Sequence, residues 1–200
     1  MPETSKYNSL FIVDVEATSP TPMTGHMTEF GVVHVVTGES FYAKLYKFTP
    51  HPDIPALPVV VTDNGKPVND VRWVITGEGG TDESVGVHPD SIAYALKAWL
   101  DGFGVSPRLV SDNNGFDAMW LNCFTDAAGV GLLFGHSSRR IGDFYAGTKG
   151  KWSDHSSWKR LRETPHTHNP VDDAQGNREA LLKILGDGTQ NSAVEVRLND

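Results

Sequence analysis

Two acidic residues interrupt an apolar run near the start of the chain. Residues 9–17, SLFIVDVEA, are mostly β-branched and aromatic, which predicts a buried strand, yet Asp14 and Glu16 lie within it. Side chains two positions apart in a strand point the same way, so the two carboxylates should project together from one face. A buried carboxylate is costly unless it is paired or bound to a cation. We therefore regard this pair as candidate metal ligands.

Four further acids occur where the chain passes into predicted helices. LVSDNNGFDAMWL contributes Asp112 and Asp117, and HTHNPVDDAQ contributes Asp172 and Asp173. Convergent carboxylates that hold two Mg²⁺ or Mn²⁺ ions are used for phosphodiester cleavage, because one ion activates water and the other stabilises the leaving oxygen. Hard oxygen ligands favour these ions over zinc. The acids thus predict a two-metal site, and the choice within each pair stays open at this point.

The stretch HTHNPVDDAQ also carries two histidines. A zinc site needs three or four convergent ligands, and His166 and His168 supply only two, so the sequence does not predict zinc. A histidine just before a helix is commonly a surface or capping residue, and His166 is predicted to be such a bystander. Asp172 lies about 100° around the expected helix from Asp173, and we expect it to interact with the positive N-terminus of that helix.

The elements that must position these residues follow an α/β pattern. Strands are predicted at 9–17, 28–36, 40–48 and 107–113, and helices at 88–104, 115–129 and 170–185. The first three strands predict an antiparallel meander, and the whole order predicts one sheet with helices packed on it. We expect a single domain over 1–188, with a Pro- and Gly-rich insertion at about 49–90 that includes a small hairpin, and a mobile tail at 189–200.

Length, charge and cysteine content restrict the class of protein. The 200 residues suit one hydrophobic core, and the 38% hydrophobic content is that of a globular chain. Cys123 is the only cysteine, which excludes an internal disulfide and favours a reducing, cytoplasmic setting. The sequence shows no signal-peptide pattern and no run of about 18 apolar residues, so no membrane association is expected. The net charge of −8 argues against a protein that coats duplex DNA, although bound divalent cations would reverse the sign locally.

Three blocks, in order, resemble those of the DEDDh group of 3′→5′ exonucleases, in the DnaQ-like superfamily that includes the proofreading subunit, oligoribonuclease and RNase T. FIVDVEATSP matches the Asp-x-Glu of the first block, and TEFGVV matches its Glu-hydrophobic-Gly strand. LVSDNNGFDAMWL matches the Asn-x-x-Phe-Asp of the second block, which selects Asp117. HNPVDDAQGNREAL matches the His-x4-Asp-Ala of the third block, which selects His168 and Asp173. The resemblance implies an RNase H-like fold, a mixed five-stranded sheet of three antiparallel strands plus parallel strands, flanked by helices.

The chain departs from the pattern of this family at two places. Asp112 stands where many members have His before the Asn, and EATSP replaces the commoner Glu-Thr-Thr-Gly. The first departure bears on contacts to metal or substrate. The second bears on how the backbone after Glu16 seats a terminal nucleotide.

The resemblance also implies roles for the five matching residues. Asp14, Glu16 and Asp173 would hold the water-activating metal ion. Asp14 would bridge to the second ion, and Asp117 would act through the water shell of that ion. His168 would accept the proton of the attacking water, a task suited to imidazole. The implied enzyme uses two Mg²⁺ or Mn²⁺ ions to hydrolyse the terminal phosphodiester bond at a single-stranded RNA or DNA 3′ end, and releases a nucleoside 5′-monophosphate.

A basic segment in this acidic chain is the candidate substrate surface. Residues 139–162 carry seven Lys and Arg against two Asp, with two Trp and one Tyr between them. Cations interleaved with aromatic rings suit a single strand, because phosphates pair with the cations and bases stack on the rings. The alternative is a solvated loop and helix with Trp158 in the core. The candidate substrate contacts are Arg139, Arg140, Lys151, Trp152 and Lys159 in this segment, and Thr18, Asn113 and Phe116 beside the acidic blocks.

Other functions remain open on the sequence alone. A non-catalytic nucleic-acid-binding or scaffolding module could use the same fold, although the five intact site residues argue against it. A zinc hydrolase is a further alternative. Relatives in this family are often homodimers, so the Trp-rich stretch is open as a dimer interface instead of a substrate surface.

Overall fold

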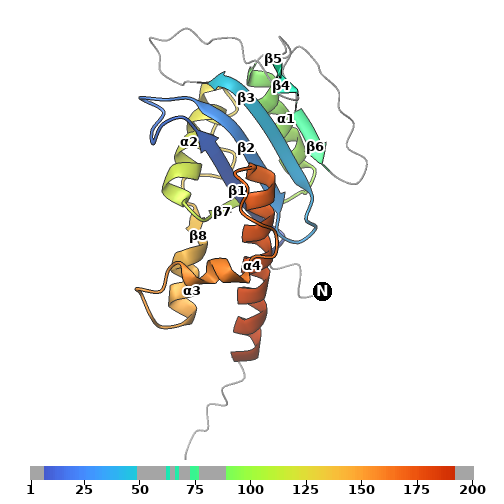
Figure 1. The fold of residues 1–200 in the computed structure, drawn as a ribbon. Coiled ribbons are helices and arrows are strands. Elements are labelled where there is room, and N and C mark those ends of the chain that lie inside the picture. Colours follow the sequence, from blue (N-terminus) through green and yellow to red (C-terminus); the bar gives the residue numbers. More distant parts are fainter. Residues whose placement is uncertain (1–6, 49–61, 64–65, 68–72, 77–88, 192–200) are drawn as a thin grey trace, which may run out of the picture.

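The computed structural model describes residues 7–48, 62–63, 66–67, 73–76 and 89–191. They form an open mixed sheet with helices on both faces, which confirms the predicted α/β class (Figure 1). The strand order is β6-β3-β2-β1-β7-β8. The bounds of these strands are β1 (Leu10–Ala17), β2 (Met27–His34), β3 (Ser40–Phe48), β6 (Trp73–Thr76), β7 (Arg108–Ser111) and β8 (Arg139–Arg140). Five of the six have at least four residues, in line with a mixed five-stranded sheet, and β8 adds two residues at one edge.

Strand β1 lies inside the sheet and joins its antiparallel and parallel parts. It pairs antiparallel with β2 and parallel with β7, and β3 pairs antiparallel with β2. The predicted meander is therefore confirmed. Parallel pairing of β1 and β7 brings their carboxyl ends to the same edge of the sheet, where Asp14 and Glu16 lie at the end of β1.

The structure describes only part of the segment 49–90, and one described strand of it joins the main sheet. Strand β6 pairs antiparallel with β3 and so belongs to the main sheet. The predicted small hairpin is confirmed by β4 (Thr62–Asp63) and β5 (Lys66–Pro67), which pair with each other. The rest of 49–88 and the last nine residues of the predicted tail, 192–200, lie outside the described residues.

Helices cover the two faces of the sheet in separate groups. They are α1 (Pro89–Asp101), α2 (Asn114–Ala127), α3 (Ile141–Thr148), the 3₁₀ turn η2 (Ser157–Leu161) and α4 (Pro170–Asn191). Helices α1 and α2 pack on one side of β1, and α3, η2 and α4 pack on the other. Figure 1 shows α4 lying across the front of the sheet. No helix in the described ranges is both long and apolar enough to cross a bilayer.

Alternation along β1 assigns its side chains to these two sides. Phe11, Val13 and Val15 are buried in the core shared with α1 and α2. Ile12 is buried in the second core, with α3 and α4. Because strand side chains alternate, Asp14 and Glu16 share the Ile12 side and face α4. The strand thus presents its two acids to the helix that carries the third sequence block.

Three helical elements differ from the sequence-based prediction. Helix α4 continues to Asn191, past the predicted end at 185, because a glycine such as Gly186 lowers helix propensity by about 1 kcal/mol without stopping a helix. Helix α3 and η2 had no predicted bounds, because the basic segment has no long apolar periodicity. Trp158 in η2 is fully buried in the second core, so the reading of this residue as part of the core is confirmed.

Candidate active site and metal-binding residues

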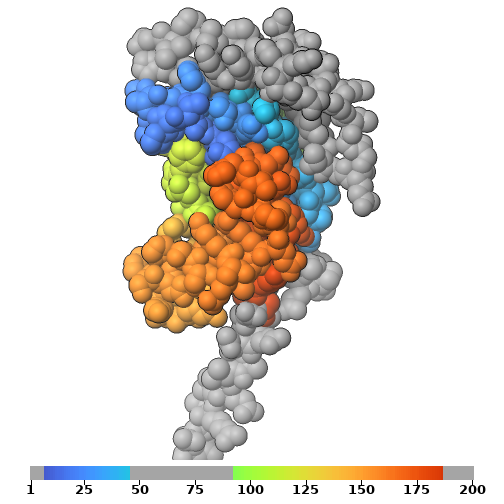
Figure 2. Space-filling model, viewed as in Figure 1, coloured from blue at the N-terminus to red at the C-terminus, as the bar shows by residue number. Residues whose placement is uncertain are grey.

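Three carboxylates from two distant parts of the chain meet at the end of β1. Asp14 and Glu16 come from β1, and Asp173 comes from the first turn of α4. One carboxylate oxygen from each lies within 4.8 Å of the others. Figure 2 shows that the segments that form this region meet on one face, with the β1–β2 end in blue, the start of α2 in yellow-green and the loop before α4 in orange. These three of the predicted metal ligands are therefore close enough to share a cation.

Gly31 is the reason that α4 can approach β1 so closely. It is the cross-strand partner of Asp14 in the β1–β2 pair. A Cβ atom at this position would lie 2.6 Å from the carbonyl carbon and oxygen of Pro170 and 2.7 Å from the backbone nitrogen of Val171. The missing side chain thus lets the first turn of α4 rest directly on β2, which places Asp173 over β1.

The first turn of α4 is held by the residues around it. Asn169 Oδ1 accepts hydrogen bonds from Val171 N at 2.9 Å and Asp172 N at 3.4 Å, so Asn169 caps the helix. Asp172 Oδ2 accepts from Thr167 Oγ1 at 3.0 Å, while Asp173 Oδ1 accepts from Thr167 N at 2.9 Å. The two adjacent aspartates therefore bind different groups of Thr167, and of the two only Asp173 belongs to the acidic group.

Asp117, the predicted fourth carboxylate, is buried beside β1. Its side chain is 3% exposed, and Oδ1 accepts a hydrogen bond from Val15 N at 3.2 Å. This bond anchors α2 to β1 between Asp14 and Glu16. Asp117 Oδ2 is buried with no hydrogen-bond partner among the described residues. A buried carboxylate oxygen in that state is destabilising unless a proton or a cation satisfies it.

The gathered carboxyls shift one another's acidity. Burial, and then the charges of Asp117, Asp173 and Glu16, raise the pKa of Asp14 to about 9, and the cation of Arg162 only partly opposes this. Burial also raises the pKa of Asp117 to about 7. For Glu16, burial raises the pKa, partly offset by His168. Without a cation the group therefore retains protons near neutral pH, and a bound divalent ion would favour its full ionisation.

His168 lies at the rim of the acidic group. Its Nδ1 is 3.7 Å from Glu16 Oε1, and its side chain is 76% exposed. Its backbone φ is +60°, the one positive φ at a non-glycine residue in the described ranges. The left-handed backbone is strained for most residues and is tolerated by His more often than by most. The turn orients the imidazole toward the end of β1 and leaves it open to solvent.

His166, which was predicted to be a bystander, lies in contact with the acidic group. Its Nδ1 lies 2.7 Å from Asp173 Oδ2, and its ring centroid is 4.4 Å from that of His168. The loop turns back at Thr167, whose backbone nitrogen binds the same carboxylate, and so brings His166 to it. The sequence-based interpretation counted only the histidines as ligands and did not consider their proximity to Asp173.

Arg162 is a site residue that the sequence-based reasoning did not single out. Its side chain is 13% exposed, and Nη2 donates to Asn177 Oδ1 at 2.5 Å and to Asp112 Oδ2 at 3.3 Å. Asp112 also pairs with Lys159 Nζ at 2.5 Å. Asp112, which departs from the family pattern, thus pairs with the basic segment instead of joining the acidic groups that could hold a metal. The signal for Arg162 was the charge excess of 139–162.

The predicted substrate contacts in the basic segment separate into paired and open residues. Lys159 is paired with Asp112, and Arg140 donates from Nε to the Asp112 carbonyl oxygen at 2.9 Å. Lys151 is exposed, and Trp152 is 82% exposed in the loop after α3. This loop therefore offers one aromatic ring and one cation to a ligand.

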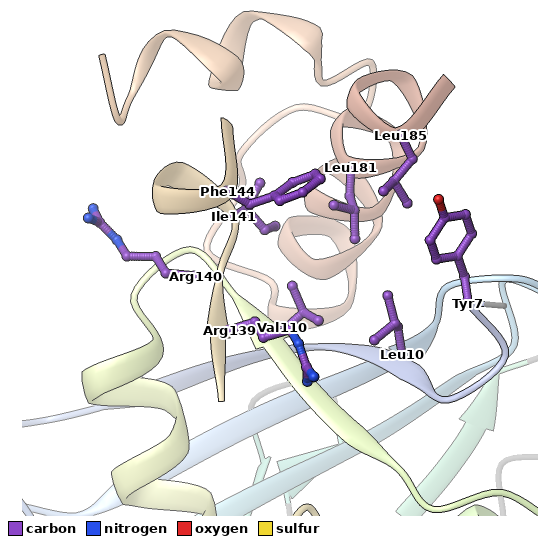
Figure 3. A pocket seen from close by; sticks show the side chains of 9 residues that line it. All are labelled: Tyr7, Leu10, Val110, Arg139, Arg140, Ile141, Phe144, Leu181 and Leu185. Atoms are coloured by element: carbon purple, nitrogen blue, oxygen red, sulfur yellow. The ribbon is translucent and has the colours of Figure 1, made fainter. Parts of the chain in front are cut away.

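Arg139 lies instead at an apolar hollow of about 400 Å³. Figure 3 shows the apolar side chains around it and the guanidinium of Arg140 directed away from them. The hollow is lined by Tyr7, Leu10, Val110, Arg139, Arg140, Ile141, Phe144, Leu181 and Leu185. Arg139 belongs to β8, which is separated from β1 by β7, and it lines this hollow.

The remaining predicted contacts follow the acidic residues in the chain. Thr18 is exposed, and its Oγ1 accepts from His26 N at 2.9 Å, which closes the turn after β1. Asn113 is exposed at the start of α2 and makes no side-chain capping bond. Phe116 packs against the first core, with its ring centroid 6.3 Å from that of Trp120. Thr18 and Asn113 thus remain accessible to a ligand, while Phe116 is mainly a packing residue.

In comparisons with known proteins, no protein-family model and no curated protein matches the chain.

Proposed function

We propose that the chain is a metal-dependent 3′→5′ exonuclease of the DEDDh type, with an RNase H-like fold, acting on single-stranded RNA or DNA ends. The observation that carries this proposal is the meeting of Asp14, Glu16 and Asp173 within 4.8 Å, with His168 at their rim. These residues come from the first and third sequence blocks. Asp117, from the second block, accepts a hydrogen bond from Val15 N, which lies between Asp14 and Glu16 in β1.

The donor set fits Mg²⁺ or Mn²⁺. All the donors are carboxylate oxygens, which these hard ions prefer. Asp117 Oδ2 is a buried oxygen without a hydrogen-bond partner among the described residues, and burial together with the neighbouring carboxylates raises the pKa of Asp14. Asp14, Glu16 and Asp173 would hold one ion, and Asp14 and Asp117 would serve a second. Such ions supply the positive charge that activates water and stabilises the leaving oxygen.

His168 is the proton acceptor in this proposal. Its exposure lets it reach a water molecule at the rim, and its Nδ1 lies 3.7 Å from Glu16 Oε1. The positive φ belongs to the turn that carries the ring at this rim.

The substrate end would lie across the exposed residues next to the carboxylates. Thr18 and Asn113 are accessible there, and the buried cation of Arg162 moderates the negative charge that a phosphate would meet. Trp152 and Lys151 would hold nucleotides further from the end by stacking and charge pairing. Trp152→Ala should weaken the binding of long oligomers more than that of dinucleotides. A change in mass on gel filtration would instead assign the ring to a homodimer interface.

The activity is tested with 5′-labelled RNA, single-stranded DNA and duplex, each with Mg²⁺ or Mn²⁺. We expect stepwise shortening of single strands, with nucleoside 5′-monophosphates as the chromatographed product, and no activity with chelator. Asp14→Asn should abolish cleavage, while His168→Ala should lower it and leave Mn²⁺ binding intact. Metal binding without cleavage of any substrate would replace the proposal with a non-catalytic binding module.

A further inference from the structure

A second group of potential metal ligands includes a residue that the proposed function does not use. Three ligand atoms, one each from His166, His168 and Asp173, lie within 4.8 Å of one another. His166 has no part in the proposed hydrolysis, and yet its ring lies against both of the others. The group differs from the carboxylate site because two of its three ligands are nitrogen.

The loop that carries the two histidines is held in place at both ends. Glu179 Oε2 accepts from the backbone nitrogens of Glu163 at 2.9 Å and Thr164 at 2.8 Å, and Oε1 accepts from Thr164 Oγ1 at 2.8 Å. Further on, Thr167 N donates to Asp173 Oδ1 at 2.9 Å. The next residue, His168, has the positive φ of +60°. These contacts preorganise the two imidazoles beside Asp173 without any ligand.

Asp173 Oδ2 is the second observation that points to a cation. Asp173 is 2% exposed, and this oxygen has no hydrogen-bond partner in the described part of the chain. His166 Nδ1 lies 2.7 Å from it, so two potential ligand atoms are in short polar contact, and His168 completes a group whose ligand atoms lie within 4.8 Å of one another.

We propose that His166, His168 and Asp173 form a Zn²⁺ site, with its fourth position open to water. Two imidazole nitrogens and one carboxylate oxygen are a common ligand set for zinc, and nitrogen ligands disfavour Mg²⁺. The side chains of His166 and His168 are 52% and 76% exposed, so an ion can enter from solvent. The two histidines alone are too few for a zinc site, and Asp173 supplies the third ligand.

Zinc at this site would compete with the proposed exonuclease activity, and this consequence rests on the proposed function. Asp173 belongs to both groups of ligands, and His168 is the proposed proton acceptor. A zinc ion would occupy both residues. We therefore expect Zn²⁺ to inhibit cleavage supported by Mg²⁺, and His166→Ala to reduce that inhibition.

The binding claim is tested without nucleic acid, by titrating the full chain with Zn²⁺ in a calorimeter. We expect one zinc per chain, and an affinity that falls more than tenfold in His166→Ala because one of three ligands is lost. His136→Ala removes an exposed histidine elsewhere and should leave zinc affinity unchanged. Equal zinc affinity in the wild type and His166→Ala would overturn the proposal.

Asp14→Asn distinguishes zinc binding at this site from metal binding at the carboxylate site. It should weaken Mn²⁺ binding and retain zinc binding, because Asp14 is not one of the three proposed zinc ligands. Loss of zinc in Asp14→Asn but not in His166→Ala would show that zinc enters the carboxylate site. Since none of these titrations uses a nucleic acid, their outcome is independent of whether the chain cleaves one.

Discussion

Gly31→Ala is the substitution that best tests how the fold assembles the candidate site. The added Cβ would lie 2.6 Å from two backbone atoms of Pro170, where ordinary van der Waals contact begins at 3.4 Å. Backbone cannot rotate away as a long side chain can, so the first turn of α4 must recede by about 0.8 Å, the difference between these two distances. Asp173 lies in that turn and would move away from Asp14 and Glu16.

The expected effects follow from that displacement. Overpacking of a close contact costs about 1–3 kcal/mol of the free energy of unfolding. A misplacement of about 1 Å in a catalytic group can lower activity roughly 100-fold. We therefore expect Gly31→Ala to remain folded at 25 °C, to bind Mn²⁺ more weakly and to lose most of its exonuclease rate.

Urea unfolding, Mn²⁺ titration and the rate of oligomer shortening should be measured on the same preparations. Gly147→Ala is the control without a clash, because its Cβ would meet nothing within 4 Å in α3, and it should stabilise that helix by up to about 1 kcal/mol. Gly142→Ala is the destabilising control, because its Cβ would clash with the His155 carbonyl oxygen, away from the carboxylates. Wild-type Mn²⁺ affinity in a folded Gly31→Ala variant would refute the reasoning that this glycine positions Asp173.

Three further predictions concern the carboxylates and the histidine. In metal-free protein the pKa values of Asp14 and Asp117 are raised from 3.8 to about 9 and about 7, so the folded state holds protons that the unfolded state has lost. The stabilisation from these bound protons is fully present below about pH 4 and is lost as pH rises through the folded-state pKa values. Thermal melts should therefore show stability falling from pH 5 to pH 8. Mn²⁺ should restore stability at pH 8, and Asp14→Asn should make stability depend less on pH. Asp117→Ala leaves Val15 N without its partner and should cost about 1–3 kcal/mol in urea unfolding, whereas Asp117→Asn keeps an acceptor and should cost less; equal losses would argue that the hydrogen bond is unimportant. His168→Gly should be about 1 kcal/mol more stable than His168→Ala, because glycine adopts φ +60° without strain, and both should lose activity; the opposite order of stability would argue against a strained turn.

The sequence predicted the acidic part of the site because its signal is local. Asp14 and Glu16 stand out in an apolar strand, and their spacing of two assigns them to one face. The meander followed from three short strands. The choice of Asp117 over Asp112 came from the family resemblance, and the structure is consistent with it, because Asp112 is paired with Lys159 and Arg162.

What the sequence did not predict depends on contacts between distant segments. The place of His166 depends on Thr167 N binding a carboxylate in the next helix, and loop geometry of this kind leaves no periodic pattern. Arg162 is one cation among seven in the basic segment, and only packing distinguishes it as buried. Strand β6 was missed because the prolines and glycines around it mask a run of only four residues.

The central claim is that the carboxylates of β1, α2 and α4 hold the divalent ions for removal of nucleotides from a 3′ end. Its most direct test is a time course with Mn²⁺ on one single-stranded oligomer carrying the label at either its 5′ or its 3′ end, for the wild type and Asp14→Asn. The proposal predicts a ladder of shortening 5′-labelled products, immediate release of a labelled mononucleotide from the 3′ end, and neither with Asp14→Asn. No release from the 3′ end by wild-type protein that binds Mn²⁺ would contradict it.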